Sequence, residues 1–571
     1  MRKKIYTWHR SCSIIIAIPV LLWAASGFMH PLMTNIRPSL ATQGLAAVPI
    51  DPHKMRVPLR EALLQNHIAT FSNFRIVHID TNWFYQVQPA RQQAPVYLSA
   101  LNGKKLAAGD WLYAQYLARQ FLEGQAVMPK TAIPDGPEGS PGPAKHGQPA
   151  VAPLLTPALA FSAEQAHDCC GAATECVLNP AKGARVTNVS QLNAFDEEYK
   201  SINRLLPVYR VNFERPDGIR VYVETTQDRF AFAMDNKRAL FDRIFTLVHT
   251  WGWLAFLGKG KVVVEGLLAL LAFFTTVMGI TIFFTTKSKN VKGNGLVKAR
   301  RNHRTISIVI ALFTLMFTFS GAFHAFSKLK DDTRDRFFVD PAFSSADLDF
   351  DLSRAEALAG GPIFNMSMVK IDGIPTLQVR LGASASGTLQ GWHQQDLMKD
   401  ARSPMPEQVY IRMGRVGPDS QGSIGMDSLL PDGEQQYARY LAGVFSGHPP
   451  GELRSCVAVT KFGSEYNFTD KRLPVWKVSY ATKDNERYYV ETSTGRLSKR
   501  VDDRSLVEEY SFAFLHKHEF MSWGGKGLKD LSTMFWALAQ IVLVTVGLIL
   551  YLKTRTVKKK GDRVPFSEIK H

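Results

Sequence analysis

Six histidines stand at positions that match between two parts of the chain, and imidazole is a common ligand of iron. Two of the pairs are 294 residues apart, and the third pair is 267 residues apart. The pairs are His9 with His303, His30 with His324, and His249 with His516. Histidines that obey an internal repeat are the first candidates for metal chemistry in this sequence.

Two segments each contain two of these histidines, at a spacing that suits a helix crossing a membrane. His9 and His30 are 21 residues apart, and so are His303 and His324. In an α-helix this spacing puts both rings within about 60° of one face and about 31 Å apart along the axis. Each helix would then hold one histidine near either membrane surface, on the face turned to its neighbours. A single histidine at a helix end is more often an interfacial residue or a cap, so the interpretation depends on the repeated set.

Facing imidazoles in a helical bundle are the ligands of a b-type haem. No C-x-x-C-H occurs, which excludes the covalent attachment of c-type haem. The predicted inner haem would use His9 and His303. The predicted outer ligands, for one haem or two, are His30, His249, His324 and His516, so haem b is expected in two copies with a third left open.

Three further residues are held in reserve for the same cofactor. His518 is close to His516, but the repeat places Trp251 opposite it in the first half. Arg10 and Arg304 follow His9 and His303 directly, where a guanidinium could bind a haem propionate or could equally be a signal of membrane orientation. The repeated Ser26-Gly27 and Ser320-Gly321 suggest helix surfaces without bulk, as a flat porphyrin needs.

Four apolar stretches are long enough to position these histidines across a hydrocarbon core of about 30 Å. They run from about 11 to 33, 262 to 286, 305 to 326 and 531 to 552. Lys and Arg gather before the first, between the second and third, and after the fourth, so these three regions are expected in the cytoplasm. A cleaved signal peptide at the N-terminus is the alternative for the first stretch, but the third repeats its pattern in mid-chain.

The repeat predicts the architecture of the whole chain. A second ungapped match, at the offset of 267, joins 206–209 to 473–476, 222–225 to 489–492 and 258–260 to 525–527. We therefore expect an integral membrane bundle of four transmembrane helices in two pseudo-symmetric halves, with two α+β periplasmic domains. The predicted divisions are 1–33, 34–245, 246–286, 287–304, 305–327, 328–512, 513–553 and 554–571.

The external segments combine hairpins and helices. Apolar residues alternate over 208–225 around Pro216-Asp217-Gly218, and over 475–492 around Asp484-Asn485, which predicts two hairpins. Helices are expected at 111–121 and 435–445. The first half also carries about 57 extra residues, which include the Pro/Gly-rich 129–157 within a predicted irregular insertion at 129–176.

Composition excludes some partners and leaves the cysteines open. The formal net charge is +18, but the basic residues cluster beside apolar runs instead of forming a groove-binding surface, so no nucleic acid is expected. Disulfides are favoured over a metal site for the external cysteines because paired C-x-x-C spacing is missing. Their pairing is left open; they are Cys169, Cys170, Cys176 and Cys456.

The helix motifs, taken with the hairpin and its Thr494-Gly495-Arg496 turn, resemble the PepSY-associated transmembrane family over nearly the whole chain. The first half departs from this pattern, because its turn reads Gln227-Asp228-Arg229. The resemblance implies a bacterial inner-membrane protein of iron uptake, with haem-bearing members that reduce ferric siderophores in the periplasm. It also implies haem ligation by the six repeated histidines.

The expected partners follow from that reading: a ferric siderophore or other iron chelate, membrane lipid, and a separate electron donor. No G-x-G-x-x-G follows a strand on the cytoplasmic side, so electrons would come from a quinol or a reduced flavin. The alternative is a non-catalytic, membrane-anchored PepSY-type protein that binds a peptide, a protease or a siderophore. A transporter is a weaker third hypothesis, because the helices lack a broken midplane site.

Overall fold

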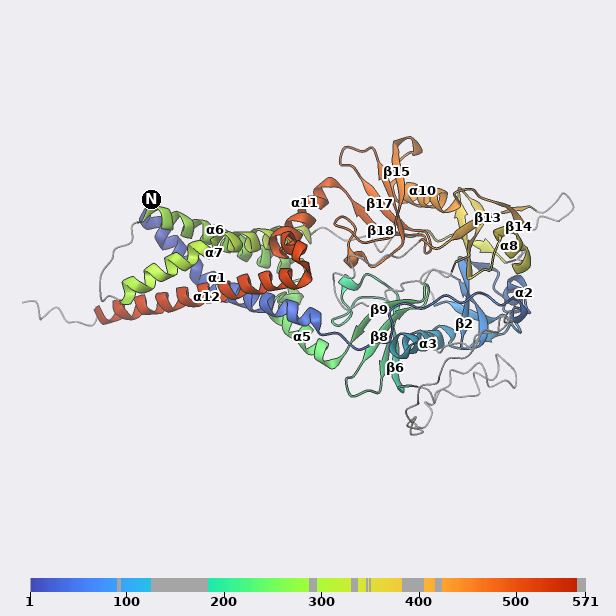
Figure 1. Ribbon diagram of the computed structural model, residues 1–571, viewed down its shortest axis with the longest axis horizontal. Helices are drawn as coiled ribbons and strands as arrows, with labels where there is room; N and C mark the ends of the chain where they lie inside the picture. Colours follow the sequence, from blue (N-terminus) through green and yellow to red (C-terminus); the bar gives the residue numbers. More distant parts are fainter. Residues whose placement is uncertain are drawn as a thin grey trace, which may run out of the picture.

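The computed structural model describes most of the chain and separates it into a helical bundle and a group of sheets (Figure 1). The described residues are 2–89, 94–124, 183–286, 295–329, 337–345, 348, 351–382, 405–415 and 424–561. Below, the first half means 2–286 and the second half means 295–561.

Four helices within the described ranges are long and apolar enough to cross a membrane, as predicted. They are α1 (Arg2–Asn35), α6 (Lys259–Thr285), α7 (Gly295–Ser327) and α12 (Gly525–Gly561). Each of the four apolar stretches lies inside one of these helices, except that the second runs one residue past α6. The prediction of a membrane protein with four apolar helices is confirmed.

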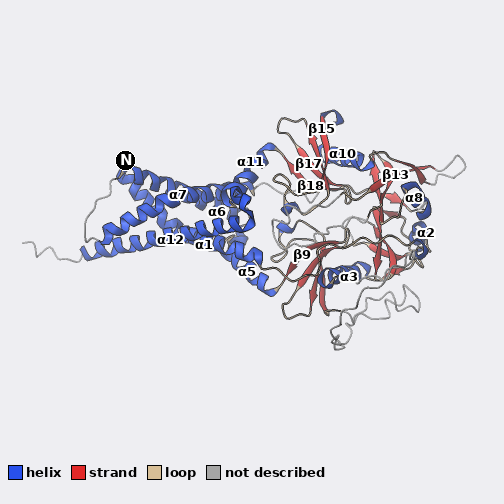
Figure 2. Cartoon of the chain, viewed as in Figure 1, coloured by secondary structure: helices blue, strands red, loops and turns tan. Residues whose placement is uncertain are grey.

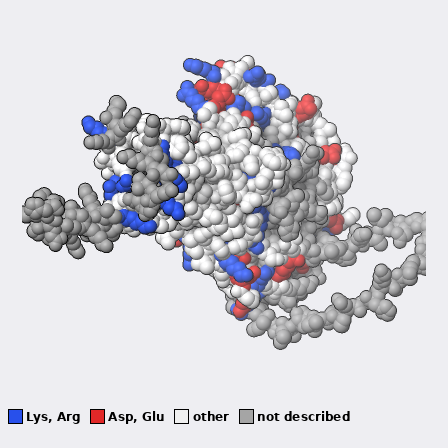
Figure 3. Space-filling model, turned by 60° about the vertical axis from the view of Figure 1, so that its left-hand side comes forward, with Lys and Arg blue, Asp and Glu red and all other residues white. Residues whose placement is uncertain are grey.

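The helices pack as a ring in the order α1, α6, α7, α12. Helices α1 and α7 therefore face each other across the bundle, as do α6 and α12. We call the end of the bundle where α1 begins at Arg2 and α6 ends at Thr285 the loop-side end. The other end, where α1 ends at Asn35 and α6 begins at Lys259, faces the sheets, and we call it the domain-side end. Lys and Arg gather at the loop-side end, while the visible side of the bundle carries almost no charge (Figure 3). An uncharged flank between polar ends is what a bilayer requires.

Two antiparallel four-stranded sheets form the extramembrane part of the first half. The sheet farther from the bundle contains β2 (Asn73–Ile79), β3 (Asn82–Gln88), β4 (Val96–Ser99) and β5 (Lys105–Leu106). The nearer sheet contains β6 (Val186–Leu192), β7 (Val208–Phe213), β8 (Arg220–Glu224) and β9 (Arg229–Met234). Helix α3 (Gly109–Glu123) packs on the nearer sheet, and α2 (Leu59–Gln65) lies at the far end.

The second half repeats this order of elements. Figure 2 shows its strands and helices as a second group beside those of the first half. Its far sheet contains β11 (Asn365–Ile371), β12 (Ile374–Arg380), β13 (Gln408–Arg415) and β14 (Ile424–Leu429). Its near sheet contains β15 (Leu453–Val459), β16 (Val475–Tyr480), β17 (Arg487–Glu491) and β18 (Arg496–Val501). Helices α8 (Leu352–Ala359) and α10 (Gly433–Ser446) accompany them.

One hydrophobic core joins the far sheets of the two halves. It includes Phe74 and Tyr85 from the first half and Met366 and Leu377 from the second, each almost fully buried. Strand β1 (Thr70–Phe71) pairs with β10 (Phe343–Ser344), so backbone hydrogen bonds also cross between the halves. The extramembrane parts are thus not two independent units.

Short helices return the chain from each near sheet to the bundle. Helix α5 (Asn236–Val248) is capped by Asp235, whose carboxylate accepts from the Arg238 backbone N–H at 2.7 Å. Helix α11 (Asp503–Ser511) is capped by Asp502 in the same way, 267 positions later. Side-chain capping fixes where each helix starts, and so fixes the approach of the histidines that follow.

The predicted hairpins and helices are confirmed, but the far sheets were not predicted. β7 and β8 form the first hairpin and β16 and β17 the second, while α3 and α10 cover the two expected helices. The near sheets place apolar residues of β7 alternately in the core, which the sequence pattern shows directly. Strands β2–β5 and β11–β14 were not predicted, although β2 and β3 match β11 and β12 without a gap at an offset of 292, with Asn73 against Asn365 and Gln86 against Gln378.

The structure bears on two further predictions, one for three tryptophans and one for the external cysteines. Trp251, Trp253 and Trp523 stand close to the apolar stretches, where the sequence favours an interfacial aromatic belt, but Trp251 is only 5% exposed and stacks on Trp23, with ring centroids 5.2 Å apart. Trp253 and Trp523 are exposed, as a belt requires. Cys456 lies in β15 without a disulfide to any described cysteine. The insertion, with Cys169, Cys170 and Cys176, lies outside the described residues.

Candidate functional site

The loop-side end of the bundle brings together the predicted inner pair. His9 lies on α1 and His303 on α7, which face each other across the bundle, and the two imidazoles interact electrostatically. His9 Nδ1 lies 3.0 Å from the carbonyl oxygen of Thr275 on α6. His303 Nδ1 is buried and has no hydrogen-bond partner among the described residues.

A glycine of the adjacent helix makes room for each of these two rings. A Cβ added to Gly279 on α6 would lie 3.2 Å from His9 Cε1, and one added to Gly547 on α12 would lie 3.3 Å from His303 Cε1. Such distances are tighter than ordinary van der Waals contact, so any side chain at either position would push the imidazole aside. The glycines therefore set the position of the rings.

At the domain-side end, the first half contributes His30 from α1 and His249 from the residue after α5. His249 Nδ1 lies 2.8 Å from Ser26 Oγ, and its backbone carbonyl accepts from Trp23 Nε1 at 3.1 Å. Ser26 is 1% exposed. His30 makes no hydrogen bond through its ring to the described part of the chain.

The second half repeats this arrangement with His324 on α7 and His516 after α11. His516 Nδ1 lies 3.2 Å from Ser320 Oγ, the serine that matches Ser26 in the repeat. His324 differs from His30, because its Nδ1 lies 2.7 Å from the carboxylate of Glu508. The two halves thus share the contact between histidine and serine. The contact of His324 with the Glu508 carboxylate has no counterpart at His30 among the described residues.

These contacts decide which ring nitrogen is free. A carbonyl oxygen only accepts, so His9 Nδ1 carries the proton in its contact with Thr275. Ser26 Oγ donates to the Leu22 carbonyl at 2.7 Å, which leaves its lone pairs to accept from His249 Nδ1–H. Ser320 does the same through Met316 at 2.6 Å. In each case Nε2 keeps a lone pair, the state in which imidazole binds a metal.

A phenylalanine lies against both domain-side histidines of each half. Phe512 stacks on His324 with ring centroids 3.9 Å apart and on His516 at 4.7 Å, both nearly parallel. Phe245, its repeat equivalent, contacts His30 at 5.2 Å and His249 at 4.5 Å. A flat ring that stacks on two others separates them, so Phe512 would have to move before His324 and His516 could bind one iron.

The four domain-side histidines nevertheless form one cluster. His249 interacts electrostatically with His30, and His516 interacts with both His249 and His324. The proximity of His249 to His516 joins the two halves at this end of the bundle. One histidine from each half could therefore bind a shared ligand without displacing Phe245 or Phe512.

The reserve residues occupy distinct surroundings. His518 is fully buried, with Nδ1 3.0 Å from Ser532 Oγ and with Nε2 lacking a partner in the described ranges. Its ring stacks on Phe317 at 5.1 Å. His518 breaks the repeat and was therefore held in reserve, yet Ser532 contacts its ring as Ser320 contacts the ring of His516.

The reserve arginines are both engaged with the bundle. Arg304 donates to the carbonyls of Phe283 and Thr286 at the end of α6, where a cation also offsets the helix dipole. The Arg10 guanidinium lies 5.0 Å from the ring centre of Tyr551 on α12. The repeated small residues serve packing: Gly27 faces Ala537 of α12, whereas Gly321 faces His516.

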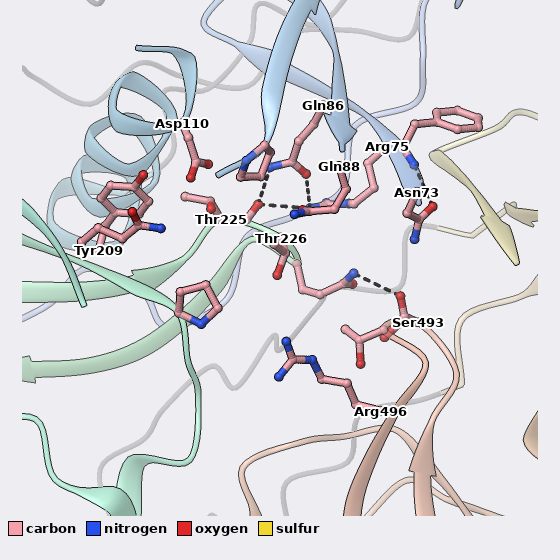
Figure 4. A pocket seen from close by; sticks show the side chains of 16 residues that line it. Asn73, Arg75, Gln86, Gln88, Asp110, Tyr209, Thr225, Thr226, Ser493 and Arg496 are labelled. Atoms are coloured by element: carbon pink, nitrogen blue, oxygen red, sulfur yellow. Dashed lines mark hydrogen bonds between the residues drawn. The ribbon is translucent and has the colours of Figure 1, made fainter. Parts of the chain in front are cut away.

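A polar cavity opens between the extramembrane domains of the two halves (Figure 4). Gln227 Nε2 crosses it to donate to the Ser493 carbonyl at 3.2 Å. Its lining includes amide, hydroxyl and guanidinium groups from Gln86, Thr225, Gln227, Ser493 and Arg496. No group of three or more His, Cys, Asp and Glu side chains in the described residues is arranged to hold a metal ion.

Buried ion pairs hold the two near sheets together across this interface. Glu491 on β17 bonds to Arg472 at 2.8 Å and to Arg229 from the first half. Glu224, its repeat equivalent, lies 3.6 Å from Arg229 and 3.9 Å from Arg472. Burial alone would raise the pKa of Glu491, but the two guanidinium groups outweigh it and lower the pKa to about 2. Glu491 is therefore an anion at neutral pH.

Comparison with known families supports the resemblance drawn from the sequence. Residues 148–398 match the family described as the PepSY-associated TM region. This match includes α6 and α7 and is narrower than the nearly complete coverage that the sequence motifs suggested. No curated protein matches the chain.

Proposed function

Because the chain is a membrane protein that carries the PepSY-associated TM region, we propose that it is a haem b-containing electron-transfer protein of the bacterial inner membrane. It would reduce iron held by periplasmic ferric siderophores, as part of iron uptake. The observation that carries the proposal is the set of buried histidines at both ends of the bundle, with Nδ1 engaged by a carbonyl or a serine in three of the six.

The residues at each end fit a haem ligand set. His9 and His303 would hold an inner haem across the diagonal of the bundle. The outer ligands would come from His30, His249, His324 and His516, with His518 in reserve. Haem bound at these positions would accept and pass on single electrons.

The protein's own contribution is to orient and shield. Ser26 and Ser320 hold two imidazoles in the tautomer that offers Nε2, which fixes their direction before any ligand binds. Gly279 and Gly547 leave room for the loop-side rings. Phe245 and Phe512 keep the domain-side histidines of one half apart, which favours ligation across the halves.

The proposed orientation places the loop-side end in the cytoplasm. Arg10, Arg301, Arg304 and Lys553 lie near that end, as the positive-inside rule expects. Both termini would be cytoplasmic, the sheets periplasmic, and the two halves related by a pseudo-two-fold axis along the membrane normal. Electrons would enter from a quinol or a reduced flavin at the loop side and leave toward the sheets.

Reduction would also release the metal. Siderophore oxygens bind Fe(III) tightly as a hard ion and hold the softer Fe(II) less well. The chelate would dock against the extramembrane domains, near the outer histidines. In this reaction one electron from the donor would pass to Fe(III), which becomes Fe(II), while the chelator stays unchanged.

The first test is a visible spectrum of the detergent-purified protein, dithionite-reduced minus air-oxidised. Sharp b-type bands that weaken in His30→Ala and His324→Ala would support the proposal, and bands lost separately in His9→Ala would distinguish the two ends. His448→Ala is the matched control, because His448 lies on an extramembrane surface between Glu452 and Glu486.

The opposite result has a clear meaning. A colourless protein, expressed with ample haem, would contradict electron transfer and favour a PepSY-type binding protein whose histidines are structural. Reduction of a ferric siderophore in liposomes that contain a reduced quinol would then test the enzymatic step itself.

A further inference from the structure

The two halves present different groups to the helix histidine at the domain-side end. In the second half, a carboxylate oxygen of Glu508 lies 2.7 Å from His324 Nδ1. The repeat places His30 at the position of His324, at the offset of 294, and Phe241 at the position of Glu508, at the offset of 267. The first half therefore has a phenylalanine where the second half has a carboxylate.

The near sheet of the second half anchors the helix that carries this carboxylate. Asp502 caps α11 and fixes where the helix begins. Glu509, the residue after Glu508, bonds to Lys499 of β18 at 2.9 Å. The Lys499 side chain is only 3% exposed and also donates to the Glu465 carbonyl at 2.7 Å. These contacts hold Glu508 against the bundle independently of any ligand.

The same segment makes a second contact with the histidine. Phe512 follows Glu508 by four residues, about one helical turn, and stacks on the His324 ring with centroids 3.9 Å apart. Phe245 takes its place in the first half and contacts His30 at 5.2 Å. The aromatic contact is therefore common to both halves, and the carboxylate distinguishes them.

Other charged groups act on these rings without a hydrogen bond to them. Asp530 acts electrostatically on His30, but it is bound to Lys526 at 2.6 Å. Two lysines act on His324, where their positive charges oppose that of the carboxylate; they are Lys328 and Lys517. In the part of the chain that the structure describes, Glu508 is the only carboxylate that is hydrogen-bonded to a candidate haem ligand.

This contact changes what the His324 imidazole offers to a metal. A carboxylate only accepts, so His324 Nδ1 carries the proton and Nε2 keeps the lone pair. Hydrogen bonding to a carboxylate makes an imidazole a more basic ligand. A more basic ligand with a negative charge behind it stabilises Fe(III) more than Fe(II), because the ferric ion has the higher charge. An imidazole beside a phenyl group lacks this effect.

We infer that the Glu508 carboxylate lowers the reduction potential of the haem ligated by His324, and so suits that haem to the reduction of a ferric chelate. This inference rests on the proposed function for the presence of haem. Chelator oxygens that bind Fe(III) more tightly than Fe(II) lower the potential of the iron they hold, so its reduction needs a donor of low potential. Glu508 acts through His324 and is a positioning residue.

The test is a redox titration of the full-length protein in nanodiscs, followed by the visible absorption of haem. Glu508→Gln removes the charge at nearly constant size, and Phe241→Glu places a carboxylate at the matching position of the first half. Asp503→Asn is the matched control, because it removes one negative charge from the first turn of α11, at a side chain that is 50% exposed and pairs with Arg487. The haem lost in His324→Ala identifies the component to follow.

We expect Glu508→Gln to raise the midpoint potential of the haem that is lost in His324→Ala, and Asp503→Asn to leave every potential unchanged. Loss of the carboxylate should change the preference of the site for Fe(III) over Fe(II) by about tenfold or more, which corresponds to about 59 mV for a one-electron couple. Phe241→Glu should lower the potential of the haem that His30 ligates. If His30 and His324 bind one haem, the two substitutions shift the same component in opposite directions.

Three results would overturn the inference. In the first, Glu508→Gln keeps its haem and all potentials stay unchanged. In the second, Asp503→Asn shifts the same haem by the same amount, which would make the effect a general one of charge. In the third, Glu508→Gln loses the haem, which would assign Glu508 to haem retention. A colourless wild type would contradict the proposed function and this inference together, whereas bound haem with unchanged potentials would contradict the inference alone.

Discussion

Replacing Glu491 with glutamine should loosen the junction of the two halves by a predictable amount. Its side chain is 1% exposed and bonds to both Arg229 and Arg472. The folded pKa of about 2, against an ordinary 4.5, corresponds to a favourable interaction of about 3 kcal/mol in the charged form. Removing one partner of a buried pair costs about 3–5 kcal/mol, so the two approaches agree.

The repeat supplies internal comparisons for this substitution. Glu224 lies 3.6 and 3.9 Å from the same two arginines, so Glu224→Gln should cost less than the loss of the closer contacts of Glu491. Glu214 is 62% exposed and lies 3.9 Å from Arg185, so Glu214→Gln should change stability by less than about 0.5 kcal/mol. The expected order of destabilisation is Glu491, then Glu224, then Glu214.

Urea unfolding of the detergent-solubilised protein, followed by tryptophan fluorescence, measures the differences if unfolding is reversible. The pH dependence adds a second check. Because the folded pKa is depressed, the stabilisation by Glu491 is complete above about pH 4.5 and is lost as the pH falls toward 2. Glu491→Gln should lack this component. Equal costs for Glu491→Gln and Glu214→Gln, or an unchanged acid dependence, would refute the reasoning.

Three further substitutions test the histidine sites through haem content, measured as pyridine haemochromogen. Gly279→Leu should displace His9 and lower loop-side haem, whereas Gly527→Leu, which meets nothing within 4 Å, should not. Ser320→Ala removes the contact to His516 at 3.2 Å and should weaken haem retention by about tenfold or more, with Ser307→Ala as control. His516→Ala should lose more haem than His518→Ala; equal losses would make His518 a ligand of the same rank.

The bundle and the hairpins were predictable because their patterns are local. An apolar run of about 20 residues has few structural alternatives, and alternation over 208–225 reports the pleat of a half-buried sheet. The far sheets were harder, since β2 and β3 match β11 and β12 at an offset of 292 with few identical residues, and β4 matches β13 only after the offset changes to 313. Their strands also belong to a core shared between distant segments, such as Phe74 and Met366.

The candidate site was predictable as a list of residues but not as an arrangement. The repeat identified the histidines, and the structure groups them at the two ends of the bundle. The hydrogen-bond partners of the imidazole rings could not be predicted from the sequence, because Ser26 and His249 are 223 residues apart and meet only through the packing of α1 on α5. The small residue at 26 was noted for its size, whereas its hydroxyl is what contacts the histidine.

The pairing of β1 with β10 has a consequence for how the chain is assembled. Thr70 and Phe71 find their strand partners at Ser344 and Phe343, which a ribosome makes more than two hundred residues later. Until then the first half has its own helices in the membrane but an unfinished sheet edge and an open apolar core outside it. Two fragments separated between α6 and α7 and made in one cell should therefore recombine, since each fragment carries the surface that the other lacks.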